Sequence, residues 1–261
     1  MRALAVNQDV IVVVSAIWQT TATFVRSGEE GFLIDSPIMP EELDALPSLS
    51  EQAGFPVSGL LCTHADWDHL LGRLAFPEAS LGVGEPSAER LRAEPGAAQR
   101  KLRSFDEEHY VEGRPPLRLA ALQSLPVPGR LSIGDAAEIE LHPASGHTAD
   151  GTAFWMPWTR VLVCGDYLSA VEIPMISMGG SADEYLATLR RLTPLVEAAE
   201  MVVPGHGTPL GPEQAGRILA EDLDYVTAVA RGEDPPLPAD RRTTHQKEIH
   251  ADNLSRLGVQ K

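Results

Sequence analysis

Short apolar runs alternate with amphipathic stretches along the chain. Within the first 35 residues the apolar positions form strand-like runs: Val10 to Trp18 is rich in β-branched residues, and segments 21–27 and 31–35 flank a glycine-containing turn. This pattern predicts strands, two of them joined as a hairpin. Segment 41–54 then has helical spacing and predicts a short helix that breaks near Pro47 and closes at Gly54.

The remainder of the chain mixes further strands with helices. Apolar runs predict strands at 57–63, 79–84, 136–144, 151–158, 160–166 and from 200. Helical patterns begin near 68 and cover 181–199 and 211–232, and Ser181 with Glu184 forms a capping box at the start of the second. Hairpin-linked strands mixed with strand–helix units favour a layered α/β sandwich with mixed sheets. No glycine-rich phosphate loop follows a strand.

Two segments depart from this pattern. Residues of about 86–125 are charged and helical, with an interruption at Pro95-Gly96, and predict a helical insertion or lid; a solvated surface helix is the alternative. Residues 241–261 form a polar C-terminal tail, which is either an extra surface helix or partly disordered. The expected organisation is therefore one domain over 1–240, which includes the insertion, followed by the tail at 241–261.

Composition and charge narrow the range of partners. The formal net charge of −16 disfavours nucleic acid, so a small-molecule substrate is expected. No apolar stretch is long enough to span a membrane and no signal-peptide pattern is evident, so we expect a cytoplasmic protein without membrane contact. Cys62 and Cys164 lie in apolar runs and are expected to be buried free thiols. The sequence leaves open whether the protein forms a homodimer.

Histidines and aspartates gather where apolar runs end. The stretch LLCTHADWDHLLG holds His64, Asp66, Asp68 and His69, and three more such residues follow later strands: His147 in SGHTADG, Asp166 in CGDYL and His206 in PGHG. Any one of them taken alone would be read as a cap or turn residue. Together, four imidazoles and three carboxylates at strand ends predict a site for two divalent metal ions.

These motifs resemble the metallo-β-lactamase superfamily. Its signature, H-x-H-x-D-H followed by a histidine in GHT, an aspartate after a strand and a histidine in GHG, is matched in order from about Val10 to Ala230. The resemblance implies a four-layered αββα sandwich with two mixed β-sheets and the metals at one edge. It also implies a ligand set: one metal held by His64, Asp66 and His147, the other by Asp68, His69 and His206, with Asp166 as the bridge.

Asp66 departs from the family signature, which has histidine at this position. A carboxylate there resembles the flavodiiron branch, although we do not expect a flavodoxin domain, because the sequence ends soon after the predicted sandwich. Three aspartates and one bridging hydroxide would neutralise two divalent ions, whereas a histidine would leave one positive charge. Asp66 is therefore expected to weaken the metals as Lewis acids and to favour iron or manganese over zinc, the most common metal of the family.

The ligand set predicts a mechanism. Metal-bridged hydroxide would attack a small ester, lactone, thioester or related substrate, with Asp68 transferring a proton. The apolar segment 170–180 is expected to border the site, and Tyr167, His109 and Tyr110 are candidate substrate contacts. Two alternatives remain: an iron-dependent oxygen or redox enzyme of the flavodiiron or persulfide dioxygenase type, and a non-catalytic member that binds a single metal.

Overall fold

Two mixed β-sheets form the centre of the molecule. The computed structural model describes residues 1–119 and 121–258. The first sheet has seven strands in chain order, antiparallel from β1 to β4 and parallel from β4 to β7. Its strands are β1 (Arg2–Asn7), β2 (Val10–Val14), β3 (Thr21–Ser27), β4 (Glu30–Asp35), β5 (Gly59–Cys62), β6 (Ser80–Gly84) and β7 (Leu122–Leu125).

The second sheet has five strands in the order β12-β11-β10-β9-β8. Only β11 and β12 pair in parallel; the other neighbours are antiparallel. The strands are β8 (Gly129–Ile133), β9 (Ala137–Pro143), β10 (Thr152–Met156), β11 (Val161–Val163) and β12 (Met201–Val203). Both sheets are therefore mixed, as the sequence predicts.

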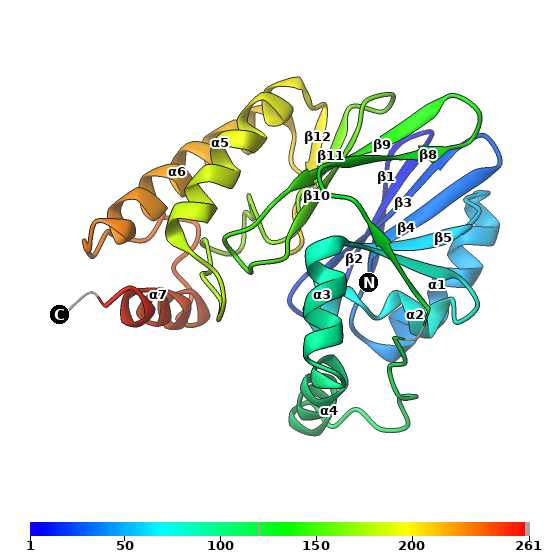
Figure 1. The fold of residues 1–261 in the computed structure, drawn as a ribbon, viewed down its shortest axis with the longest axis horizontal. Helices are drawn as coiled ribbons and strands as arrows, with labels where there is room; N and C mark the ends of the chain where they lie inside the picture. Colours follow the sequence, from blue (N-terminus) through cyan, green and yellow to red (C-terminus); the bar gives the residue numbers. More distant parts are fainter. Residues whose placement is uncertain (120, 259–261) are drawn as a thin grey trace.

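Helices cover the outer face of each sheet, which gives the four layers seen in Figure 1. Beside the first sheet lie α1 (Pro40–Ala53), α2 (Gly72–Ala75), α3 (Glu85–Ala93) and α4 (Ala97–Glu108). Beside the second lie α5 (Ala182–Ala198), α6 (Pro212–Ala230) and α7 (Thr244–Arg256). The predicted αββα sandwich is confirmed. Among the described residues, no helix combines the length and apolar character needed to cross a membrane.

Three apolar clusters hold the four layers together. Side chains alternate between the two faces of a strand, so a strand that is covered on both faces contributes to two clusters. In β4, Leu33 packs under the helices of the first sheet, whereas Ile34 packs between the sheets. In β11, Val161 lies between the sheets and Leu162 faces α5 and α6. Burial on both faces explains why these strands are apolar runs without polar alternation.

Local expectations fail where tertiary packing outweighs the local signal. Helix α1 runs without a break through Pro47 and ends, as predicted, before Gly54 in the left-handed conformation. The missing N–H at Pro47 costs one hydrogen bond, but the burial of Leu43 and Leu46 keeps the helix on the sheet. The helix expected from 68 is only the 3₁₀ turn Trp67–His69 and the short α2.

The two unusual segments are largely helical. Helices α3 and α4 lie within 86–125, but that range also includes β7, which pairs with β6 and belongs to the sheet. In the tail, residues 244–256 form α7, which buries Ile249 and Leu254 against the α5–α6 core; residues 259–261 lie outside the described residues. The limits of the domain, and the role of the insertion as a lid, stay predictions.

A buried ion pair joins the tail to α6. Arg241 and Asp222 are each 1% exposed, and the guanidinium donates to the carboxylate at 2.6 Å. Burial raises the pKa of Asp222 to about 7, even though Arg241 counteracts this shift. The carboxylate therefore depends on its partner to remain charged in the core.

We expect Arg241→Met to lower the free energy of unfolding by about 3 kcal/mol or more, because it leaves Asp222 buried without its partner. An acid with a raised pKa is protonated more readily in the folded state, so the loss should be largest at about pH 8 and smaller at about pH 5. Urea unfolding measures both values. As a control, Arg217→Met breaks an exposed pair with Glu221 on the same helix and should cost below about 0.5 kcal/mol. Equal losses in the two variants would contradict the prediction.

Candidate metal centre

All seven predicted ligands converge at one edge of the sandwich. They come from the loops that follow β5, β9, β11 and β12, strands that belong to both sheets. The convergence needs close backbone approach at Gly205, because a Cβ there would overlap Asp166 Oδ1 and crowd the His69 ring. The GHG context of His206 thus has a steric reason. All of the seven side chains except Asp66 and Asp166 belong to buried residues.

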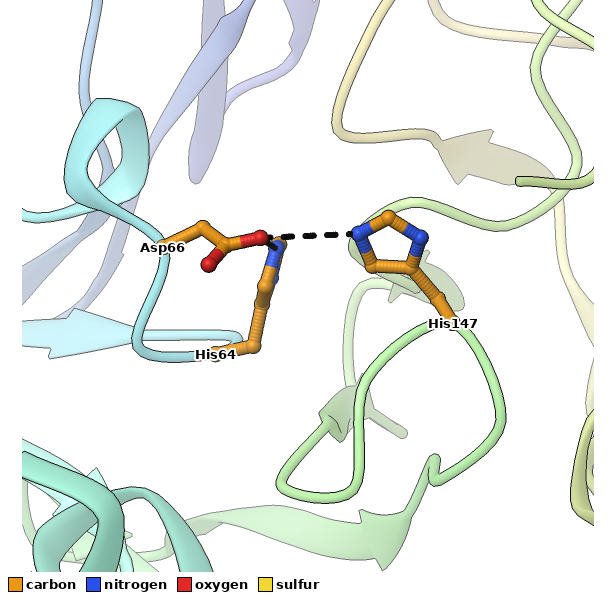
Figure 2. A group of neighbouring side chains, drawn as sticks. All are labelled: His64, Asp66 and His147. Atoms are coloured by element: carbon orange, nitrogen blue, oxygen red, sulfur yellow. Dashed lines mark ion pairs between the residues drawn. The ribbon is translucent and has the colours of Figure 1, made fainter. Parts of the chain in front are cut away.

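One half of the cluster consists of His64, Asp66 and His147, shown in Figure 2. Asp66 Oδ2 lies 3.6 Å from His64 Nε2 and 3.8 Å from His147 Nε2. Figure 2 shows one carboxylate oxygen of Asp66 turned toward the two rings and the other turned away. Despite the shorter side chain of aspartate, Asp66 reaches the position expected of a ligand.

The other half consists of Asp68, His69 and His206. Asp68 Oδ2 lies 3.6 Å from His69 Nε2 and 3.5 Å from His206 Nε2. Between the halves, Asp166 turns Oδ2 to His147 at 3.2 Å and His64 at 3.6 Å, and Oδ1 to His69 at 3.3 Å and His206 at 3.6 Å. One carboxylate therefore has an oxygen in each half, which is the arrangement of a bridging ligand.

The donor atoms fit divalent metal ions. A tetrahedral zinc site with bonds of about 2.1 Å has donors about 3.4 Å apart, and the observed separations lie around this value. Within the described part of the chain, His64 Nε2, His69 Nε2, His147 Nε2 and Asp166 Oδ1 are buried without a hydrogen-bond partner. Buried polar atoms normally have partners, so these four are the atoms that metal ions would satisfy.

The opposite nitrogen of each of the four imidazoles lies next to an oxygen atom of the protein. Nδ1 of His64 lies 3.1 Å from Thr63 Oγ1, and Nδ1 of His69 lies 3.0 Å from Asp35 Oδ2. For the other two rings the partners are carbonyl oxygens: Met175 O at 2.8 Å from His147 and Trp18 O at 3.0 Å from His206. A carbonyl accepts only from a protonated Nδ1, so Nε2 of His147 and His206 is left free to bind metal.

Asp35 supports two ligands at once, and sequence reasoning missed it. Its carboxylate accepts from the Thr63 hydroxyl at 2.8 Å and the Thr63 amide at 2.8 Å, in addition to its contact with His69. Asp35 is 3% exposed and has a φ of 59°, a strained value for a residue other than glycine. The available signal was its place at the end of the apolar run GFLID, the same context as Asp166.

The charges of the cluster stabilise one another. Burial opposes the charged form of His147 and His206, yet nearby carboxylates, including that of Asp166, overcome it and raise the pKa of each to about 10. Burial likewise opposes ionisation of Asp66, but His147 and His64 hold its pKa well below the usual range. The imidazoles of His147 and His206 are therefore protonated on both nitrogens near neutral pH when no metal is bound, and metal binding must displace one proton from each.

A second set of missed residues surrounds Asp66. Arg90 of α3 donates from NH2 to Asp66 Oδ1 at 2.6 Å and from NH1 to Asp150 Oδ1 at 2.7 Å. Asp150, from the SGHTADG loop, accepts from the amide of Ala65 at 2.8 Å. The sequence contains no local sign of these contacts, since Arg90 lies in the segment read only as a charged insertion.

The three residues predicted as substrate contacts, Tyr167, His109 and Tyr110, differ in their burial and their neighbours. Tyr167 is 2% exposed; its hydroxyl accepts from the His147 amide and donates to neighbouring backbone, so it supports a ligand loop. His109 stacks on Phe105, and Tyr110 is 91% exposed. Both cysteines are buried free thiols, as expected.

Aromatic rings form one wall beside the ligands. Trp18 packs edge-on against Trp67, which lies between Asp66 and Asp68, and against Phe105. Trp18 has a φ of 53° and Gln19 a φ of 52°, which are strained values for residues other than glycine. Two contacts maintain this conformation: Trp18 O lies next to His206 Nδ1, and Gln19 O accepts from the Gly207 amide.

Comparisons with known proteins agree with this architecture. A family model described as the metallo-beta-lactamase superfamily matches residues 16–206. The chain is 24% identical over 251 residues to a hydroxyacylglutathione hydrolase of Ruegeria pomeroyi, which covers 90% of this chain and 85% of the relative.

Solved structures share the fold. The sec-alkylsulfatase Pisa1 from Pseudomonas sp. has a TM-score of 0.72 at 14% identity, covering 99% of this chain and 50% of its own. TTHA1623 in a di-iron-bound form has a TM-score of 0.62 at 24% identity, covering 79% of this chain and 97% of its own. Because the family model spans well over half of the residues, the chain belongs to the metallo-beta-lactamase superfamily and is a metallo-hydrolase.

Proposed function

We propose that the protein hydrolyses a small ester, lactone or thioester with the help of two divalent metal ions. The position of Asp166, with one carboxylate oxygen toward each pair of histidines, carries this proposal. Bound in the two halves, the ions would supply a hydroxide nucleophile near neutral pH and the positive charge that stabilises an oxyanion. The similarity to a hydrolase of hydroxyacylglutathione supports a thioester as the first substrate to test.

Asp68 is the residue that we assign to proton transfer. Its backbone is held by Ser36, whose hydroxyl donates to the Asp68 carbonyl at 3.0 Å and accepts from the Leu71 amide at 3.0 Å. With Oδ2 directed toward His69 and His206, its second oxygen is left to accept a proton from the nucleophile and deliver it to the leaving group.

The aromatic wall favours a substrate with an apolar part next to the bond that is cleaved. Trp18 is 43% exposed, although its ring packs on Trp67 beside the ligands. When a substrate covers a large, half-exposed apolar side chain beside a reaction centre, the burial of apolar surface makes the free energy of binding more favourable. We assign Trp18 this role.

An iron-dependent oxygen or redox enzyme is the second candidate. Asp66 gives the site three carboxylates, which harder ions prefer to zinc. The structurally similar TTHA1623 is known in a di-iron-bound form. The identity of the native metal does not by itself distinguish the two candidates, since a hydrolase can also use iron. The reaction that the protein catalyses must be measured as well.

We expect two metal ions per chain in the wild type and about one in His147→Ala, because Asp68, His69 and His206 remain in place. Elemental analysis of desalted protein measures the count. His142→Ala is the control, since this half-exposed histidine pairs with Glu140, away from the ligands, and should leave both ions bound. A wild-type count near one would instead support a single-metal member.

Metal-loaded protein should hydrolyse at least one thioester, ester or lactone in a broad panel. We expect Asp68→Asn to lower kcat by at least about 100-fold in samples whose metal content matches the wild type, because a general acid–base is lost. Oxygen consumption is recorded with the same samples. Oxygen uptake without hydrolysis would favour the redox candidate and overturn the hydrolase proposal.

We expect Trp18→Ala to raise KM about 10-fold for substrates with an apolar acyl group, with kcat little changed, because it removes apolar contact and no ligand. Steady-state kinetics across a series of acyl chain lengths measures the effect. Tyr110→Ala is the control, since this more exposed aromatic ring should leave KM unchanged. An unaltered KM in the Trp18 variant would remove Trp18 from the substrate site.

A further inference from the structure

The two carboxylate oxygens of Asp66 have different partners: one accepts a hydrogen bond from Arg90, and the other faces two histidines. Its NH2 group donates to Asp66 Oδ1 at 2.6 Å, while Oδ2 faces His64 and His147. The orientation in Figure 2, with one oxygen turned away from the rings, is the one that this hydrogen bond requires. With Oδ1 occupied, Asp66 has one oxygen left for a metal.

The guanidinium is itself fixed. Its NH1 group donates to Asp150 Oδ1 at 2.7 Å, and Asp150 is 2% exposed. Asp150 Oδ2 accepts from the Ala65 amide at 2.8 Å and lies 2.9 Å from Ser87 Oγ. The network therefore joins α3, the SGHTADG loop and the backbone between His64 and Asp66. A forked, planar cation is needed to bridge two carboxylates in this way.

Lys101 of α4 cannot replace Arg90 in this role. Its ammonium lies 3.7 Å from Asp66 Oδ1, and its side chain is 58% exposed. At this distance it makes no hydrogen bond, and solvent screens its charge. Arg90, by contrast, is 22% exposed at its side chain and makes a close charge-assisted bond.

The charge of Arg90 alters the balance of the metal centre. Two divalent ions with three aspartates and one hydroxide sum to zero, and a histidine in place of Asp66 would give one positive charge. The guanidinium of Arg90 adds one positive charge beside Asp66, but Asp150 shares that guanidinium. Arg90 therefore offsets the charge of Asp66 in part.

We propose that Arg90 is a positioning residue that makes Asp66 a one-oxygen ligand with a partly compensated charge, so that the pair replaces the histidine usual at this position. The inference rests on the proposed two-metal site. It assigns the insertion a defined part in the metal centre, because Arg90 lies on α3.

Zinc affinity measured by chelator competition tests the proposal without any substrate. Arg90→Gln should weaken the binding of one zinc ion by at least about 10-fold, as expected when a partner that orients a ligand is lost. Arg114→Gln is the matched control: Arg114 is a buried arginine of the same insertion that pairs with Asp106 at 2.9 Å, away from the ligands, and should leave the affinity within about twofold.

The Asp66→His background separates positioning from a general structural role. With a neutral ligand there, Arg90 has no carboxylate ligand to orient, and its positive charge opposes the metal, so adding Arg90→Gln should tighten zinc binding by at least about threefold. The same substitution then has opposite effects in the two backgrounds. Equal losses in both backgrounds, or no change in either, would overturn the proposal.

Two further outcomes are distinguishable. If wild-type protein binds two zinc ions and Arg90→Gln matches it, this inference fails and the proposed function stands. Wild-type protein that binds no zinc, manganese or iron overturns both. If Arg90→Gln does not fold, as circular dichroism would show, Arg90→Lys takes its place: it keeps the charge but loses the fork, and should still weaken zinc binding in the Asp66 background alone.

Discussion

The carboxylate of Asp166 sets the geometry of the whole centre. It is the only ligand with an oxygen in each half, and four imidazoles lie within 3.6 Å of its two oxygens. Such a concentration of polar atoms is unfavourable in a protein interior unless something satisfies them. The fold therefore supplies rigid support from behind: every imidazole has its Nδ1 next to an oxygen atom of the protein, and the Asp166 carbonyl accepts from the Tyr185 hydroxyl at 3.1 Å.

Asp66 shows how a departure from a motif can be compensated at a distance. Counting the ligands alone suggests a neutral site with weak Lewis acidity. The bond from Arg90 would change that count in part, since a cation beside the site acts on bound metals without being a ligand, although Asp150 shares this cation. The bare motif is thus an incomplete guide to metal preference, and the preference for iron or manganese inferred from Asp66 alone loses part of its physical basis.

The predictable part of the site is the part that repeats a local pattern. His64, Asp166 and His206 each follow an apolar run, and parallel or mixed sheets bring such strand ends to a common edge. Their supports carry no such pattern. Trp18 and Met175 act through backbone carbonyls, whose role no side chain reveals, and Trp18 is 188 residues from His206. The fold class was predictable for the same reason as the ligands, whereas the continuity of α1 through Pro47 depends on burial that only the assembled sheet provides.

The C-terminal helix connects to the ligands through the loop that follows Asp166. Asn253 of α7 donates to Pro174 O at 2.7 Å and accepts from the Ile176 amide at 2.9 Å. It therefore binds the residues on either side of Met175. Met175 O is the partner of His147 Nδ1, which places one residue between the tail and a ligand. The polar tail, which the sequence alone suggests to be a surface helix or partly disordered, thus belongs to the scaffold that orients the candidate ligands. Its buried polar side chains are explained by this task, because the loop carries backbone groups that no strand or helix of its own can satisfy.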